Sequence, residues 1–288
     1  MLIPRFATIP RTSGFVPPSE NIGKLRNKGF DFLVAYNGQA GDFNFQIGVN
    51  GGYSKNEVVY YDEPSETLAW QTITGRPFNT PLIYNAIGVF KDQAAVDAYP
   101  HWDNARPGDI IFQDVNEDGK IDGNDRIRLE NNTVPQFQGG LTLDTQYKGF
   151  DFSLLFQAAS GARSYIRTQS GDFGNYLTDF ADGRWTSENP SSEKPRTFNR
   201  EDEYWISQAN TYWYRNTNYV RLKNIQLGYT FPSEMISKVG LKTARLYVNA
   251  INLVTWDSFK VFDPETDNQD GTVYPQKKTF NIGVNLSF

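Results

Sequence analysis

Cysteine is absent from this 288-residue chain, histidine occurs once and methionine twice. Without cysteine the chain has no disulfide, no thiol nucleophile, no thiolate zinc site and no lipidated cysteine. The one histidine, His101, lies in no motif that would supply an orienting partner, and no nucleophile–base pair is recognisable. The acidic run 201–203 indicates solvated loop charge, because glycosidase acids must be set by burial. The sequence therefore argues against an enzyme.

Long apolar runs and an excess of basic residues are also missing. No stretch of about 18 apolar residues exists, so no transmembrane helix is predicted. A formal charge of −5 argues against a nucleic-acid partner, which would call for a basic face. The first residues lack the apolar segment of a signal peptide, so we expect the chain to begin inside a longer one.

Aromatic residues and glycine are abundant, with 16 Tyr, 21 Phe, 6 Trp and 24 Gly, which favours strands over helices. The last ten residues alternate strictly between apolar and polar side chains. Successive side chains of a strand point to opposite faces, so one face of this strand is wholly apolar. A β-sandwich and a transmembrane β-barrel both produce that pattern. We interpret the apolar positions as an outer-membrane insertion signal: Phe280, Ile282, Val284, Leu286 and Phe288.

The lengths of the connections between strands separate these two folds. Alternation recurs at 21–37, 43–50, 137–147, 150–157, 224–231 and 246–249, and a short helix is predicted at 91–99. Short links (38–41, 148–149, 232–240) alternate with long ones (54–134, 159–216, 256–274). Outer-membrane barrels have short periplasmic turns and long extracellular loops, whereas a sandwich has no reason to sort its loops by length. We predict an all-β fold, a partial antiparallel transmembrane β-barrel in which seven to nine strands are readable, with 54–134 as a large extracellular loop.

One segment resembles a known family closely. Residues 219–232, YVRLKNIQLGYTFP, are similar to a strand of the SusC/RagA-type TonB-dependent outer-membrane transporters, and further matches follow the same order at 21–24, 27–30, 107–110, 114–122, 246–248, 252–253 and 263–265. The resemblance implies that residues 1–288 are the C-terminal strands of a barrel of about 22 strands, whose plug and signal peptide are absent here. It also implies outer-membrane import of oligosaccharides or other large nutrients, such as peptides. The implied partners are a SusD-like surface lipoprotein and, through the missing plug, the TonB complex.

An acidic loop within 54–134 fits a calcium-binding template. Calcium takes 6–8 oxygen ligands, and alternate carboxylates in a tight turn can deliver them, with glycine at the bend. The last position is aspartate where an EF-hand has glutamate, and the alternative is a turn that caps itself by side-chain hydrogen bonds. The candidate calcium ligands are Asp114, Asn116, Asp118, Lys120 (through its carbonyl), Asp122 and Asp125.

Aromatic residues crowd the end of the second long connection. Aromatic faces can stack on sugar rings, so Tyr204, Trp205, Tyr212 and Trp213 are candidates for substrate binding. The alternative, which the sequence favours, is an aromatic girdle with loop packing. A different function stays open at this stage, namely a secreted, calcium-stabilised β-sandwich that binds glycans.

Overall fold

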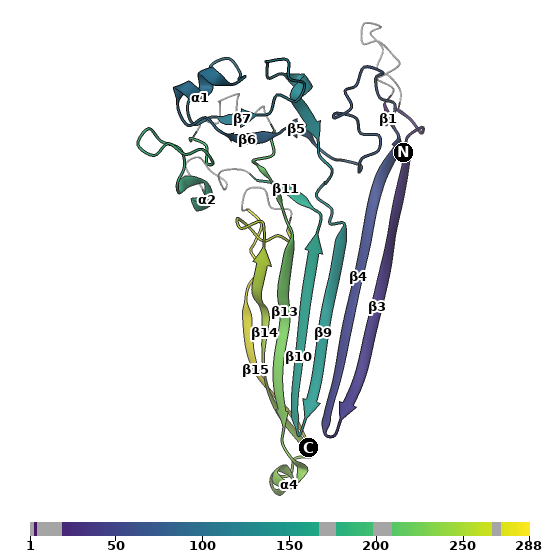
Figure 1. The fold of residues 1–288 in the computed structure, drawn as a ribbon. Helices are drawn as coiled ribbons and strands as arrows, with labels where there is room; N and C mark the ends of the chain where they lie inside the picture. Colours follow the sequence, from purple (N-terminus) through teal and green to yellow (C-terminus); the bar gives the residue numbers. More distant parts are fainter. Residues whose placement is uncertain (1–2, 5–18, 167–176, 198–208, 267–271) are drawn as a thin grey trace.

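The computed structural model describes residues 3–4, 19–166, 177–197, 209–266 and 272–288 (Figure 1). Within them, seven long strands form one antiparallel sheet in the order β15-β14-β13-β10-β9-β4-β3. These strands are β3 (Lys24–Ala40), β4 (Phe43–Tyr60), β9 (Phe137–Tyr147), β10 (Phe150–Ser160), β13 (Tyr219–Thr230), β14 (Thr243–Asp257) and β15 (Thr279–Ser287). The seven strands predicted by the alternation are therefore confirmed.

The register across the sheet keeps apolar and polar side chains on separate faces. One row of paired positions on the first face is apolar: Ile47, Leu143, Leu154, Ile225, Ala250 and Phe280. The adjacent row on the other face is polar: Gln46, Asp144, Ser153, Gln226, Asn249 and Asn281. A slip of one residue in any strand would mix the two sets, so the pattern of polarity fixes the register.

The apolar face is open, not covered by a second sheet. Phe280 is 69% exposed, Ile282 79% and Phe288 79%. A sandwich would bury these side chains between its two sheets. The β-sandwich alternative is therefore wrong, and the single two-faced sheet confirms the partial barrel.

Aromatic side chains flank the apolar face at both ends of the strands. Near the short turns the rings of Phe43 and Tyr147 lie 6.4 Å apart, and at the far end of β9 Phe137 pairs with Tyr53. Phe137 and Tyr147 are ten positions apart on the same face of β9. At about 3.3 Å per residue and a barrel tilt of about 40°, their separation along the barrel axis is about 25 Å, the height of the apolar band in outer-membrane barrels.

Short and long connections lie at opposite ends of the strands (Figure 1). At the end with the short links, β9 and β10 are joined by Lys148 and Gly149, whose φ values of 45° and 86° form the left-handed turn typical of two-residue hairpins. The third short link, at the same end of the strands, carries α4 (Ser233–Ile236) and the 3-10 helix η3 (Ser237–Val239). The three long connections emerge at the opposite end of the strands, as the loop lengths predicted.

The predicted start of each long loop is too early; for the second loop, expected from 159, β10 continues to Ser160. β4 continues to Tyr60, so residues 54–60 belong to a strand and not to the first long loop. Likewise β14 continues to Asp257, although the third loop was expected to begin at 256. Residues 54–60 of β4 pair with 24–29 of β3 and extend past the end of β9. We call these two segments the β3–β4 extension. It carries polar residues such as Lys55 and Glu57, so the alternation that marks a half-buried strand is lost there.

The described parts of the long connections pack into a layer of their own, the loop layer. It contains β5 (Leu82–Tyr84), β6 (Ala86–Val89), α1 (Gln93–Ala98), β7 (Ile110–Phe112), the 3-10 helix η2 (Gly123–Asp125), β8 (Arg126–Arg128), β11 (Arg163–Tyr165), α2 (Thr178–Ala181) and β12 (Tyr214–Asn216). The short pair β1 (Ile3–Pro4) and β2 (Ser19–Glu20) lies outside the large sheet. The helix predicted at 91–99 is confirmed by α1, which Asp92 caps by accepting from Ala95 N at 2.9 Å. No helix in the described ranges is long and apolar enough to cross a membrane.

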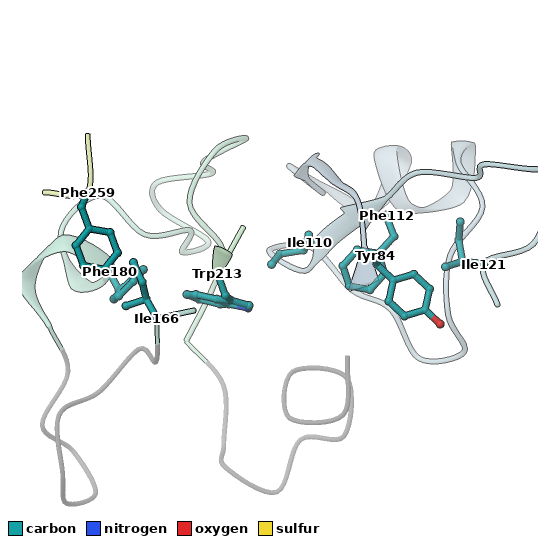
Figure 2. Packing of buried hydrophobic residues seen from close by; sticks show 8 residues of the cluster. All are labelled: Tyr84, Ile110, Phe112, Ile121, Ile166, Phe180, Trp213 and Phe259. Carbon is teal, nitrogen blue, oxygen red and sulfur yellow. The ribbon is translucent and has the colours of Figure 1, made fainter. Parts of the chain in front are cut away.

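The main hydrophobic cluster lies in the loop layer and not on the sheet (Figure 2). Its members come from all three long connections: Tyr84, Ile110, Phe112, Ile121, Ile166, Phe180, Trp213 and Phe259. Tyr84 stacks on Phe112 with ring centroids 4.8 Å apart. Backbone bonds also join the first and second connections, since Tyr84 N donates to Ala209 O and Thr211 N donates to Tyr84 O. The described parts of the three long connections thus form one folded layer.

Candidate functional site

A polar pocket lies where the polar face of the sheet meets the loop layer. We call it the rim pocket; its volume is about 340 Å³. Strands β9, β10, β11 and β13 and all three long connections contribute its lining residues, which are Thr133, Pro135, Gln138, Gln157, Ala159, Ser160, Ala162, Arg163, Ser164, Thr217, Tyr219, Pro264, Glu265 and Thr266. Because hydroxyl and amide groups dominate the lining, the pocket can both donate and accept hydrogen bonds.

A buried arginine holds one wall of the rim pocket in place. Arg221 of β13 is 2% exposed and donates through Nη2 to Asp263 Oδ2 at 2.7 Å and through Nη1 to Glu265. Its Nε donates to Thr255 Oγ1 of β14 at 2.8 Å, and Nη1 also reaches Gln276 Oε1 at 2.6 Å. One guanidinium therefore ties the third connection to two strands of the sheet. Removing it would leave the partly buried Asp263 without its cation and Glu265 with Lys223 alone.

Glu265 is the acceptor at the centre of this wall. Its carboxylate accepts from Lys223 Nζ at 3.0 Å and from the Tyr219 hydroxyl at 3.0 Å, in addition to Arg221. Burial raises the pKa of Glu265, but the hydrogen bond from Lys223 and the charge of Arg221 outweigh it, so the net pKa lies below the ordinary value. The carboxylate is therefore ionised at neutral pH, and the neighbouring cations compensate its charge.

The backbone beside the opposite wall is fixed by two asparagines. Gly161, between β10 and β11, has φ of +87°, a left-handed conformation that favours glycine. Its N–H donates to Asn218 Oδ1 at 2.9 Å, and its carbonyl accepts from Asn131 Nδ2 at 2.8 Å. Both backbone polar groups of the bend are thus satisfied by side chains, and Arg163 follows two residues later. The pocket is pre-organised on both sides.

The predicted calcium loop closes on itself. Gly119 N donates to Asp114 Oδ2 at 2.9 Å, and Lys120 N donates to Asp118 Oδ1 at 2.9 Å. Asp125, which is fully buried, accepts from Val115 N at 2.9 Å and from Asp122 N at 2.7 Å. Among the described residues no group of three or more His, Cys, Asp or Glu side chains is arranged to hold a metal ion.

One oxygen of this loop is left without a partner. Asp114 Oδ1 is buried and has no hydrogen-bond partner in the part of the chain that the structure describes. The side chains of Asn116 and Asp118 bond to each other at 2.8 Å, and Asp122 caps η2 by accepting from Asn124 N at 2.7 Å. The turn expected as the alternative is therefore present, and calcium binding stays a prediction.

The aromatic candidates divide into two groups. Tyr204 and Trp205 lie outside the described residues. Trp213 is 3% exposed and packs edge-on against Phe180 at 5.2 Å within the loop-layer cluster (Figure 2). Burial raises the pKa of Tyr212 to about 12. The Trp213 ring faces are taken up by protein contacts, which argues against Trp213 as a stacking platform and favours loop packing.

The residues that sequence reasoning missed are those of the rim pocket. Arg221 and Glu265 both fall within stretches that resemble the transporter family, at 219–232 and 263–265, but their pairing across 44 positions has no local signal. Arg221 has the same parity as the apolar Ile225 and Leu227, and a β-bulge between Leu222 and Asn224, which the alternation does not reveal, turns it to the polar face. Arg163 lies in no motif at all.

Comparisons with known proteins agree with this fold. No protein-family model matches the chain. The chain is 30% identical over its whole length to the TonB-dependent receptor P3 of Formosa agariphila, of which it covers 31%. It is 26% identical over 94% of its length to the TonB-dependent receptor SusC of Bacteroides thetaiotaomicron, covering 27% of that protein. The chain spans about a third of the length of these curated relatives.

A solved structure extends the likeness to three dimensions. The RagAB peptide importer in its "open-open" state matches all of this chain with a TM-score of 0.70 at 23% identity, and the chain covers 31% of the matched chain. At that identity the likeness shows the fold alone. It agrees with the single barrel-type sheet and the loop layer.

Proposed function

The chain is homologous over its whole length to part of a SusC/RagA-type TonB-dependent receptor, and on this premise we propose that the protein it belongs to imports nutrients across the outer membrane. The observation that carries the proposal is the two-faced sheet. Its exposed apolar face suits lipid, and its polar face suits a water-filled or plugged lumen. Large substrates such as oligosaccharides or peptides are the proposed cargo.

The partners follow from the same premise. A SusD-like surface lipoprotein would contact the loop layer, which lies at the extracellular ends of the strands in this orientation. Energy would come from the TonB complex through a plug that lies outside this chain. The folded core of the loop layer supports this arrangement, because a surface that is already ordered loses less conformational entropy when a partner binds.

Deletion and complementation would test the import function. A strain lacking the receptor gene is compared with one carrying the intact gene, and uptake of labelled oligosaccharide and peptide mixtures is measured. We expect receptor-dependent uptake of at least one mixture and its loss when TonB is also deleted. Equal uptake with and without the receptor would refute the proposal.

Calcium binding by residues 114–125 is a second proposal. It is supported by the buried, unpartnered Asp114 Oδ1, because a buried carboxylate oxygen without a hydrogen bond is costly and a cation would satisfy it. Asn116 and Asp118 and the Lys120 carbonyl would supply further oxygens. The ion would stabilise the turn and carry no chemistry.

A further inference from the structure

The rim pocket contains one cation, Arg163, whose charge no described residue pairs with. Arg163 lines the pocket, and its guanidinium makes no hydrogen bond or ion pair with any of the described residues. The other charged groups at the pocket are matched: Arg221 and Lys223 neutralise Asp263 and Glu265. With Arg163 included, the group has three positive and two negative charges. Among the described residues the local balance is therefore positive, although the whole chain is acidic.

The backbone around Arg163 is fixed before any ligand arrives. Arg163 N donates to Asn132 O at 2.8 Å, and the residue pairs with Asn216 of β12. The neighbouring Ala162 carbonyl accepts from Thr217 N at 3.1 Å, which fixes β11 beside β12. Because this backbone is already fixed, ligand binding has to order only the Arg163 side chain and not the strand that carries it.

We infer that the rim pocket binds a carboxylate group of the imported oligomer, with Arg163 as the residue that pairs with it. A planar guanidinium matches a carboxylate through two parallel hydrogen bonds, and no other lining residue supplies an unmatched positive charge. The amides of Gln138 and Gln157 and the hydroxyl of Ser160 would contact neutral groups of the same ligand. The inference rests on the proposed import function and adds the chemical class of cargo.

The carboxylate could belong to an acidic sugar or to an acidic peptide. The test uses two matched pairs of labelled oligomers with the complete receptor in cells. One pair is a galacturonic-acid tetramer and its methyl ester; the other is a glutamate-containing pentapeptide and its glutamine analogue, both with amidated C-termini. Each pair differs only in the carboxylates, so the preference within a pair measures carboxylate recognition.

Arg163→Gln removes the charge and Arg163→Lys keeps it. Arg126→Gln is the matched control, because Arg126 is an exposed loop-layer residue that does not line the pocket. We expect the wild type and Arg126→Gln to prefer the acidic member of one pair. Arg163→Gln should raise the half-saturating concentration of that member about ten- to a hundredfold, the range for a hydrogen bond to a charged group, without changing the neutral member. Arg163→Lys should restore part of the preference.

Two outcomes would overturn the inference. One is receptor-dependent uptake with no preference within either pair, or with no uptake of the acidic members. The other is a preference that Arg163→Gln leaves intact. Neither affects the import function, which fails only if deletion of the receptor changes uptake of no nutrient mixture.

Discussion

Substitution of Arg221 by glutamine should release the third connection from the sheet. The change removes the guanidinium that joins β13 to Asp263 and Glu265. Breaking a buried ion pair from one side costs about 3–5 kcal/mol. Lys223 Nζ remains 3.0 Å from Glu265, and both carboxylate side chains are 13% exposed, so the lower limit of about 3 kcal/mol is expected here. That corresponds to about a hundredfold larger open population of residues 258–278.

Hydrogen exchange of the complete receptor measures this population. When closing is fast relative to chemical exchange (the EX2 regime), the exchange rate reports the free energy of local opening. Amides of residues 258–266 should therefore exchange about a hundredfold faster in Arg221→Gln. Arg26→Gln is the control, because Arg26 also pairs with a glutamate, Glu57, at 2.7 Å, but its side chain is 49% exposed. That pair should contribute less than about 1 kcal/mol to stability, so Arg26→Gln should change amide exchange rates by less than about fivefold.

The reasoning would be refuted if the two variants had similar effects. Exchange in Arg221→Gln within about threefold of the wild type would mean that the network is not what holds the third connection. A double variant with Glu265→Gln sharpens the test, because removing the leftover negative charge should recover part of the loss. If the double variant is as open as the sum of the single variants, the two residues are not coupled.

Three further predictions concern the sheet, the calcium loop and pH. Leu143→Arg, on the apolar face midway along β9, should cost about 2–4 kcal/mol and lower the amount of folded receptor in the membrane, whereas Asp144→Arg on the polar face should cost little, as heat-modifiability on gels will report. Calorimetry should detect calcium binding to the complete receptor that Asp114→Asn weakens at least tenfold; no heat in the wild type would end that proposal. Because the pKa of Glu265 is lowered on folding, its stabilisation is complete above the ordinary value of 4.5 and is lost as the pH falls through the folded pKa. The protection factors of residues 258–266, which are corrected for the intrinsic exchange rate at each pH, should therefore fall only in acid.

The sheet was predictable because its signal is local. Every second residue reports which face of a strand it occupies, so Phe280 to Phe288 and the six other strands could be recognised within a few residues each. The sorting of connections by length then predicted at which end of the strands each turn lies. Both predictions needed only neighbours in the sequence.

The loop layer and the rim pocket could not be predicted in the same way. Their contacts join distant positions: Ala86 N donates to Thr211 Oγ1, 125 residues away, and Arg221 reaches Glu265 across 44 residues. The buried Trp213 was ambiguous for the same reason, since an aromatic cluster in sequence can pack inward or face a ligand. The strand at 54–60 was missed because its residues there are mostly polar and give no alternation.

The β3–β4 extension has a mechanical consequence for the loop layer. Val58 is fully buried, its N–H donates to Arg76 O and its carbonyl accepts from Gly75 N, while Phe78 N donates to Asn56 Oδ1. The first connection is thereby bonded to a strand that runs the whole height of the sheet. A pull along that strand loads many ladder hydrogen bonds in parallel, whereas a sideways pull breaks them one after another. The outer layer should thus resist a pull along the strands more strongly than a pull across them.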